Sequence, residues 1–138
     1  LAEIVHEKLG DKEWAKKVCK KAEGKGGDCS DFRNLAEIVH EKLGDKEWAK
    51  KVYKKAEGKG EDCFDFSNLA GSIIEKLDDK EWAEKVCKKA EEKAEDSYDY
   101  ESLAERVRED LGDKKWAKLL EKKAKELEEE ENDDQDDD

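Results

Sequence analysis

Apolar residues along this chain follow a helical pattern that starts again every 34 residues. Four tryptophans mark the period: Trp14, Trp48, Trp82 and Trp116. Alignment on them gives the repeats 1–34, 35–68, 69–102 and 103–125, followed by an acidic extension of the last helix and tail at 126–138. A fixed period of this length, with two amphipathic segments in each copy, predicts a tandem array of helix-turn-helix repeats.

The second repeat shows the two segments clearly. Its first segment, about residues 31–43, carries apolar side chains from Phe32 onward at spacings of three and four, which form one stripe of a helix. Gly44 then suits the left-handed end of that helix, and Asp45 suits the N-cap of the next. The second segment follows at once, with Trp48 on its apolar face and lysines on the other. So short a turn predicts antiparallel helices.

One pair of helices cannot bury both of its apolar stripes, so each repeat needs a neighbour to cover it. We therefore predict an all-α fold in which four antiparallel helix pairs stack around one continuous core. The tryptophans are expected in this core, because an aromatic residue that recurs at helical spacing is usually a packing residue.

The first two repeats are almost identical, with differences at four positions only. Identity this high indicates recent tandem duplication or deliberate design, and the sequence does not separate these origins. Leu1 aligns with Leu35, so the turn that corresponds to residues 31–34 is missing from the first repeat. This suggests a piece of a longer array.

Charge is unevenly distributed along the chain, whose net charge is −12. All 29 basic residues lie at or before Lys125, and ten of the 41 acidic residues lie in 126–138. The body therefore holds 31 acidic against 29 basic residues, a net charge of −2. A nucleic-acid binder needs a basic face to release counterions from phosphate, so the composition does not favour such a partner. The acidic end lacks the glycine of a dedicated calcium loop, which indicates a solvated tail.

The four cysteines have no CxxC spacing and only two histidines accompany them, so a zinc site has weak support. Cys29 and Cys63 share a repeat position, and stacked pairs would hold them about 10 Å apart, beyond the roughly 7 Å reach of a disulfide. Free thiols packed as small hydrophobic residues in a reducing cytoplasm are expected. No apolar stretch approaches the roughly 18 residues of a membrane span.

Large and small residues follow a fixed order in both helices of the repeat. The order is carried by Phe32, Leu35, Ala36 and Val39 in the first helix and by Ala49, Tyr53 and Ala56 in the second. On these positions the repeat resembles the tetratricopeptide repeat, with a Sel1-like array as a more distant relative. The turn is one residue longer than the family's usual turn, and the closing proline is absent. The resemblance implies a right-handed α-solenoid whose first helices line a concave groove for a peptide or partner helix.

Carried over position by position, the resemblance gives ten groove candidates. They are His6, Arg33, Glu37, His40, Phe64, Ser67, Ile74, Tyr98, Glu101 and Arg108. The groove would be acidic with histidine at one end and apolar around Phe64 and Tyr98. Family members that clamp a carboxylate use cationic side chains and asparagine here, whereas this chain has Glu37, Gly71 and Glu105. A neutral to basic protein or peptide is therefore the expected partner.

Three functions remain open on the sequence. The first is a non-enzymatic protein- or peptide-binding scaffold without a cofactor, favoured by the four repeats and by the lack of a nucleophile placed beside a base. The second is a structural or designed array with no dedicated ligand, favoured by the near identity of the first two repeats. The third is a weak metal-responsive module that uses His6, His40 and the cysteines, because histidine titrates near neutrality and binds transition metals.

Overall fold

The computed structural model of the chain describes the backbone of residues 2–136 and the side chains of residues 12–130. Within these residues the secondary structure is all helical, as predicted, and contains no strand. The chain divides into two compact bodies, Leu1–Gly60 and Glu61–Asp138. We call them the N-terminal body and the C-terminal body.

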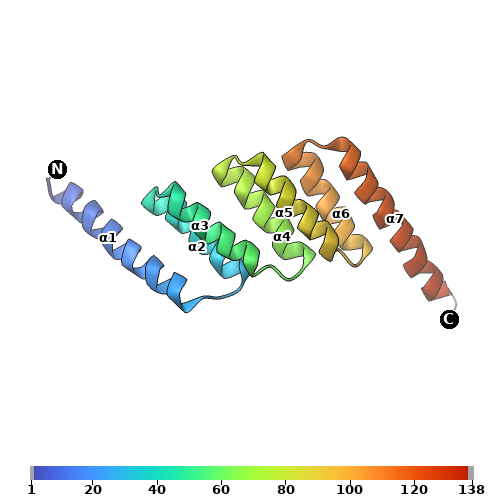
Figure 1. Ribbon diagram of the computed structural model, residues 1–138, viewed down its shortest axis with the longest axis horizontal. Coiled ribbons are helices and arrows are strands. Elements are labelled where there is room, and N and C mark those ends of the chain that lie inside the picture. The colour runs from blue at the N-terminus through green and yellow to red at the C-terminus, as the bar shows by residue number, and fades with distance from the viewer. Residues whose placement is uncertain (1, 137–138) are drawn as a thin grey trace. The chain divides into compact units, whose positions relative to one another are not determined.

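The N-terminal body contains three helices (Figure 1). Their bounds are Ala2–Lys25 for α1, Cys29–Leu43 for α2 and Lys46–Gly58 for α3. Helices α2 and α3 form an antiparallel hairpin, and α1 packs against α2. The predicted apolar stripes meet inside this hairpin, where Val39, Val52 and Tyr53 have no exposed surface. Burial of these stripes is the main favourable term for the fold, because each removes apolar surface from water.

The first repeat does not form the predicted helical hairpin, because α1 runs without a break through Gly10 and Asp11. In the second repeat, the hairpin is anchored by the capping residue Asp28 and by the buried Phe32. Continuing a helix through one glycine costs only about 1 kcal/mol, so Gly10 alone does not end α1.

The C-terminal body contains two antiparallel hairpins that lie side by side (Figure 1). Their α-helices are α4, Cys63–Ser72; α5, Lys80–Lys93; α6, Ser97–Arg106; and α7, Lys114–Asp136. Helices α4 and α6 continue as single π-helical turns, η1 at Ile73–Leu77 and η2 at Val107–Leu111. The shared core has no exposed surface at Leu69, Ile73 and Leu103. Because α6 contacts both α4 and α5, the two hairpins of this body form one packed structure.

An aspartate caps the N-terminus of α2, of α3 and of each α-helix in the C-terminal body. As predicted, Asp45 caps α3 by accepting the Trp48 backbone N–H at 3.0 Å, and Asp79 and Asp113 cap α5 and α7 in the same way. The first helices begin earlier than expected, at the N-cap residues Asp28, Asp62 and Asp96. Such side chains satisfy backbone donors that the first helical turn leaves free.

The prediction that the tryptophans lie in the core was wrong. Trp14 is 69% exposed, and the other three are half-buried. The indole N–H of Trp48 donates to Glu23 at 3.3 Å, and that of Trp116 donates to Glu91 at 3.0 Å. An indole N–H needs an acceptor, which keeps these rings at the rim, where a carboxylate can also remain in water.

The first helices of the C-terminal body end in the π turns η1 and η2, whereas α2 ends as an α-helix. Leu77 and Leu111 at the ends of η1 and η2 are buried, whereas Leu43 at the same repeat position is only half-buried. The turns that follow all place one residue in the left-handed conformation: Gly44 with φ 65°, Asp78 with φ 53° and Gly112 with φ 67°.

Asp78→Gly is expected to raise the free energy of unfolding by about 0.5 to 1 kcal/mol, because a side chain at positive φ is strained and glycine is not. Urea denaturation followed by circular dichroism measures this change. The matched control is Gly112→Asp, which makes the reverse exchange in the same body at a glycine with open space around it. It should lower stability by a similar amount. Equal effects of the same sign would contradict the explanation.

Candidate functional site

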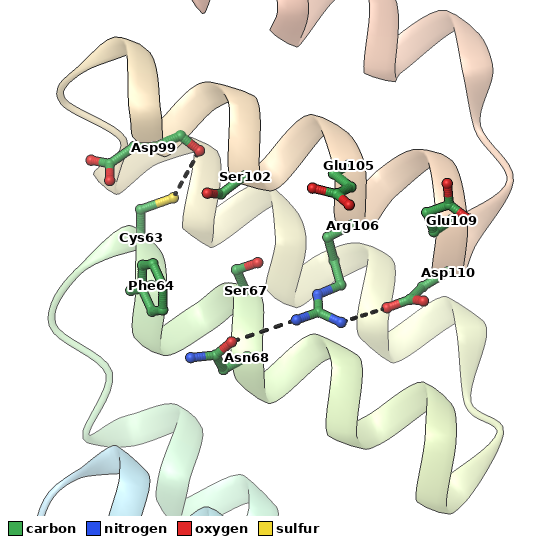
Figure 2. A pocket seen from close by; sticks show the side chains of 10 residues that line it. All are labelled: Cys63, Phe64, Ser67, Asn68, Asp99, Ser102, Glu105, Arg106, Glu109 and Asp110. Carbon is green, nitrogen blue, oxygen red and sulfur yellow. Dashed lines mark hydrogen bonds and ion pairs between the residues drawn. The ribbon is translucent and has the colours of Figure 1, made fainter.

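The C-terminal body contains a pocket of about 330 Å³ between α4 and α6, which are the first helices of its two hairpins (Figure 2). Ten residues line it: Cys63, Phe64, Ser67, Asn68, Asp99, Ser102, Glu105, Arg106, Glu109 and Asp110. One wall comes from residues 63–68 of α4, and the other comes from residues 99–110 of α6 and η2. A concave surface with both apolar and polar walls is the usual form of a binding site.

An exposed aromatic pair stands at one end of the pocket. The rings of Phe64 and Tyr98 stack with centroids 6.5 Å apart and planes 8° apart. Both residues lie two positions after the N-cap aspartate of their helix, so the 34-residue period alone brings them together. Phe64 is 48% exposed and Tyr98 is 61% exposed. Stacked rings that remain in water offer a rigid apolar platform, which is typical of an anchor point for a partner.

At the other end, the side chain of Arg106 crosses from α6 toward α4 (Figure 2). Its Nη1 donates to Asp110 at 2.9 Å, and its Nη2 donates to the Asn68 side-chain oxygen at 3.5 Å. The Nε atom is buried and has no hydrogen-bond partner within the described part of the chain. The guanidinium lies against Gly71, where an added Cβ would come within 2.6 Å of Nη1. Because Gly71 has no side chain, it leaves the space that the Arg106 guanidinium occupies.

The charges around the pocket are mainly negative. Arg106 is neutralised by Asp110, to which it is bound directly. Glu105, Glu109 and Asp99 remain on the lining, and the two glutamates are exposed. Carboxylates that line a concave surface raise the local concentration of cations. The pocket therefore suits a positively charged or neutral guest better than an anion.

Cys63 lines the pocket, and its thiol is buried. Its Sγ donates a weak hydrogen bond to the Asp99 carbonyl oxygen at 3.8 Å. Burial, together with the neighbouring carboxylates of Asp99, Asp62 and Asp96, raises the pKa of Cys63 from its ordinary value of 9.0 to about 12. Because the thiolate is the reactive form, this cysteine is a poor nucleophile at neutral pH. Burial likewise raises the pKa of Cys87 to about 12.

The structure brings together three of the ten residues predicted from the sequence. Phe64 and Ser67 line the pocket, and Tyr98 stacks on Phe64. The other predicted residues of the C-terminal body lie apart from these: Ile74 is half-buried in η1, Glu101 is exposed on α6, and Arg108 on η2 forms an ion pair with Glu121 of α7.

The remaining predicted residues belong to the N-terminal body. Arg33, Glu37 and His40 lie half-buried on α2, and the buried Nδ1 atom of His40 has no hydrogen-bond partner among the described side chains. His6 lies outside the residues whose side chains are described. Their role stays a prediction.

Sequence reasoning missed the polar end of the pocket. Arg106 stands where earlier repeats have Ile38 and Ser72, and its partner Asp110 stands where they have lysine. Positions that depart from an otherwise well-kept repeat are a signal that could have found this cluster. The groove positions carried over from the family resemblance did not include them.

The described residues contain neither a metal site nor a membrane span that would indicate a function. In residues 12–130, no group of three or more histidine, cysteine or acidic side chains could hold a metal ion. None of the four cysteines forms a disulfide and all four are buried, as predicted. Over the described residues, no helix is both long and apolar enough to span a membrane. Comparisons with protein-family models, with curated proteins and with solved structures found no match to the chain.

Gly71→Ala is expected to displace the Arg106 guanidinium without lowering stability. The added Cβ would lie 2.8 Å from Arg106 Cζ, which a flexible side chain can avoid, and alanine favours a helix by up to about 1 kcal/mol over glycine. The Arg106 Nε–H resonance in an NMR spectrum reports the displacement, and urea denaturation reports stability. Gly24→Ala, in open space on α1, is the matched control and should leave that resonance unchanged. A large loss of stability would show instead that Arg106 is held rigidly.

Proposed function

We propose that this chain is a non-enzymatic scaffold that binds a neutral to basic peptide segment of a protein partner at the pocket between α4 and α6. The observation that supports this most strongly is the exposed Phe64–Tyr98 stack at the mouth of an acid-lined pocket. An apolar side chain of the peptide would pack on the rings. A lysine or arginine beside it would face Glu105 and Glu109.

The two parts of this surface serve different purposes in binding. Rigid, partly exposed rings lose little conformational entropy when a partner covers them, so they can contribute most of the affinity. The carboxylates steer a cationic peptide toward the pocket and discriminate against acidic ones. Arg106 is already paired with Asp110 and bound to Asn68, so it positions α6 against α4 and leaves the pocket acidic.

The proposed architecture is a right-handed solenoid of tetratricopeptide type, in which the first helices of successive repeats line one groove. Its support is the 34-residue period together with the antiparallel hairpins that recur at that period. The pocket is consistent with it, because both of its walls are first helices. The buried free thiols support a reducing compartment such as the cytoplasm.

A structural or designed array without a dedicated ligand is the second candidate. The near identity of the first two repeats favours it, since duplication preserves residues that no ligand has selected. The fourth repeat argues for binding, because two of its departures form the polar end of the pocket: Arg106 and Asp110 replace residues of other types in the earlier repeats, and Arg106 donates to both Asp110 and Asn68.

The two candidates differ in what they predict for peptide selection. An array of peptides of about twelve residues, a length that covers an interface of this type, would include basic, neutral and acidic sets of equal apolar content. Binding scaffolds should select basic or neutral peptides that contain an aromatic or leucine residue. An inert array should select none, and that result would overturn the proposal.

The charge preference can be tested with paired variants. Glu105→Gln with Glu109→Gln should reduce the preference for basic peptides by roughly tenfold, an effect expected for two charges at an interface rim. The matched control makes the same change of charge on α7, at Glu128 and Glu129, both exposed. An equal effect of both pairs would show that net charge alone sets the preference.

A further inference from the structure

A second pocket, of about 650 Å³, adjoins the first one where the chain enters α4 and α6. We call it the loop-side pocket. Phe64 and Asp99 line both pockets, so the two share a wall within the C-terminal body. The other residues that line the loop-side pocket are Glu61, Asp62, Glu92, Lys93 and Glu95.

The Phe64–Tyr98 stack stands between the two pockets. Both rings belong to the first turn of their helix. The first pocket runs from there along the helices toward Glu105, which follows Tyr98 by seven residues, or about 10 Å of helix. The loop-side pocket is lined mainly by residues before these helices and at the end of α5. Carboxylates therefore lie on both sides of the aromatic stack.

The charge of the loop-side pocket is not neutralised within the described part of the chain. Its lining holds five carboxylates against one lysine, a net charge of −4. Glu61, Glu92 and Glu95 are exposed, and none of them forms an ion pair with a described residue. A concave surface with unpaired carboxylates raises the local concentration of cations, and an aromatic wall adds attraction for a cationic side chain.

Four of the residues that line the loop-side pocket depart from the first repeat. Glu92 stands where the first two repeats have glycine, and Glu61 and Glu95 stand where the first repeat has glycine. Phe64 stands where the first repeat has serine. Plain duplication would have kept the glycines and the serine. The acidic and the aromatic residues therefore differ from the first repeat together, at one surface.

We propose that the loop-side pocket binds a second cationic side chain of the partner peptide, so that the recognised motif has a lysine or arginine on each side of its apolar anchor. This inference rests on the function proposed for the first pocket. The anchor packs on the rings of Phe64 and Tyr98, one cation faces Glu105 and Glu109, and the other lies in the loop-side pocket. An extended peptide rises about 3.4 Å per residue, so about three residues separate the anchor from the cation at Glu105.

Three peptides of about twelve residues and identical composition test this, each with a central leucine and two lysines. The split peptide has one lysine three positions before the leucine and one three positions after it. The two one-sided peptides have both lysines before the leucine or both after it. Fluorescence anisotropy at low salt should show that the split peptide binds about tenfold more tightly than either one-sided peptide. This advantage should shrink as the salt concentration rises.

Glu92→Gln with Glu95→Gln should abolish the advantage of the split peptide, because it neutralises two carboxylates of the loop-side pocket. Both side chains are exposed, so the variant should fold. Glu128→Gln with Glu129→Gln, on α7, changes the net charge equally and should keep the advantage. Equal affinity of the three peptides for the wild-type chain, or the same loss in both variants, would overturn this inference and leave the first pocket as the binding site. Binding of none of the three would overturn the proposed function as well.

Discussion

Replacing both Phe64 and Tyr98 with alanine is expected to weaken binding of a selected basic peptide by at least about a hundredfold, since two aromatic anchors commonly contribute 2 kcal/mol or more each. Both side chains are largely exposed, so their loss removes the platform without opening a core cavity. Fluorescence anisotropy with the labelled peptide measures the affinity. Urea denaturation should show a stability close to that of the wild type.

The matched control for this pair is Trp14→Ala. It removes an aromatic ring that is 69% exposed and lies in the other body. This variant should bind the peptide as the wild type does. A similar loss of affinity in the control would mean that the peptide binds exposed aromatic rings in general, and the proposed site would then be wrong.

Leu69→Ala is expected to lower the free energy of unfolding by about 2 to 5 kcal/mol, the usual cost of a core cavity. Leu69 has no exposed surface and lies on α4, directly in the core that supports the pocket. The control is Leu119→Ala, the same chemical change at a leucine that is 67% exposed, which should cost less than about 0.5 kcal/mol. Chemical denaturation measures both changes. Equal costs would contradict the assignment of the core.

Much of the local structure could be predicted from single residues. The stripe from Phe32 to Val39 is buried as its spacing predicted, and Gly44 and Asp45 end one helix and begin the next. These features depend on neighbours within one turn of a helix, and such local preferences survive in the folded chain. The π turns η1 and η2 could not be foreseen, because Leu77 and Leu111 at their ends share a repeat position with Leu43 and differ from it only in how deeply they are buried.

The errors concern residues whose environment depends on a neighbouring repeat. Trp48 fits an apolar stripe by spacing, but its indole N–H binds Glu23, 25 residues away, so the ring stays at the rim. Periodicity also treats all repeats alike, and it therefore predicted a turn at Gly10 although α1 continues through it.

The candidate site could be predicted in part. Its aromatic end follows from the period, which places Phe64 and Tyr98 at the same repeat position and hence beside each other. Its polar end could not be predicted from the period, because the long side chain of Arg106 reaches Asn68 on a different helix. That reach requires the small Gly71 beneath it, a three-dimensional condition that no single helix pattern contains.

The central claim is that a neutral to basic peptide binds between α4 and α6, and chemical-shift mapping tests it most directly. The ¹⁵N-labelled chain is titrated with a peptide selected on the array. The largest shifts should fall on Phe64, Ser67, Asn68 and Ser102, together with the Nε–H of Arg106. Shifts concentrated instead on the lysine-rich surface of α5, or no shifts at saturating peptide, would contradict the claim.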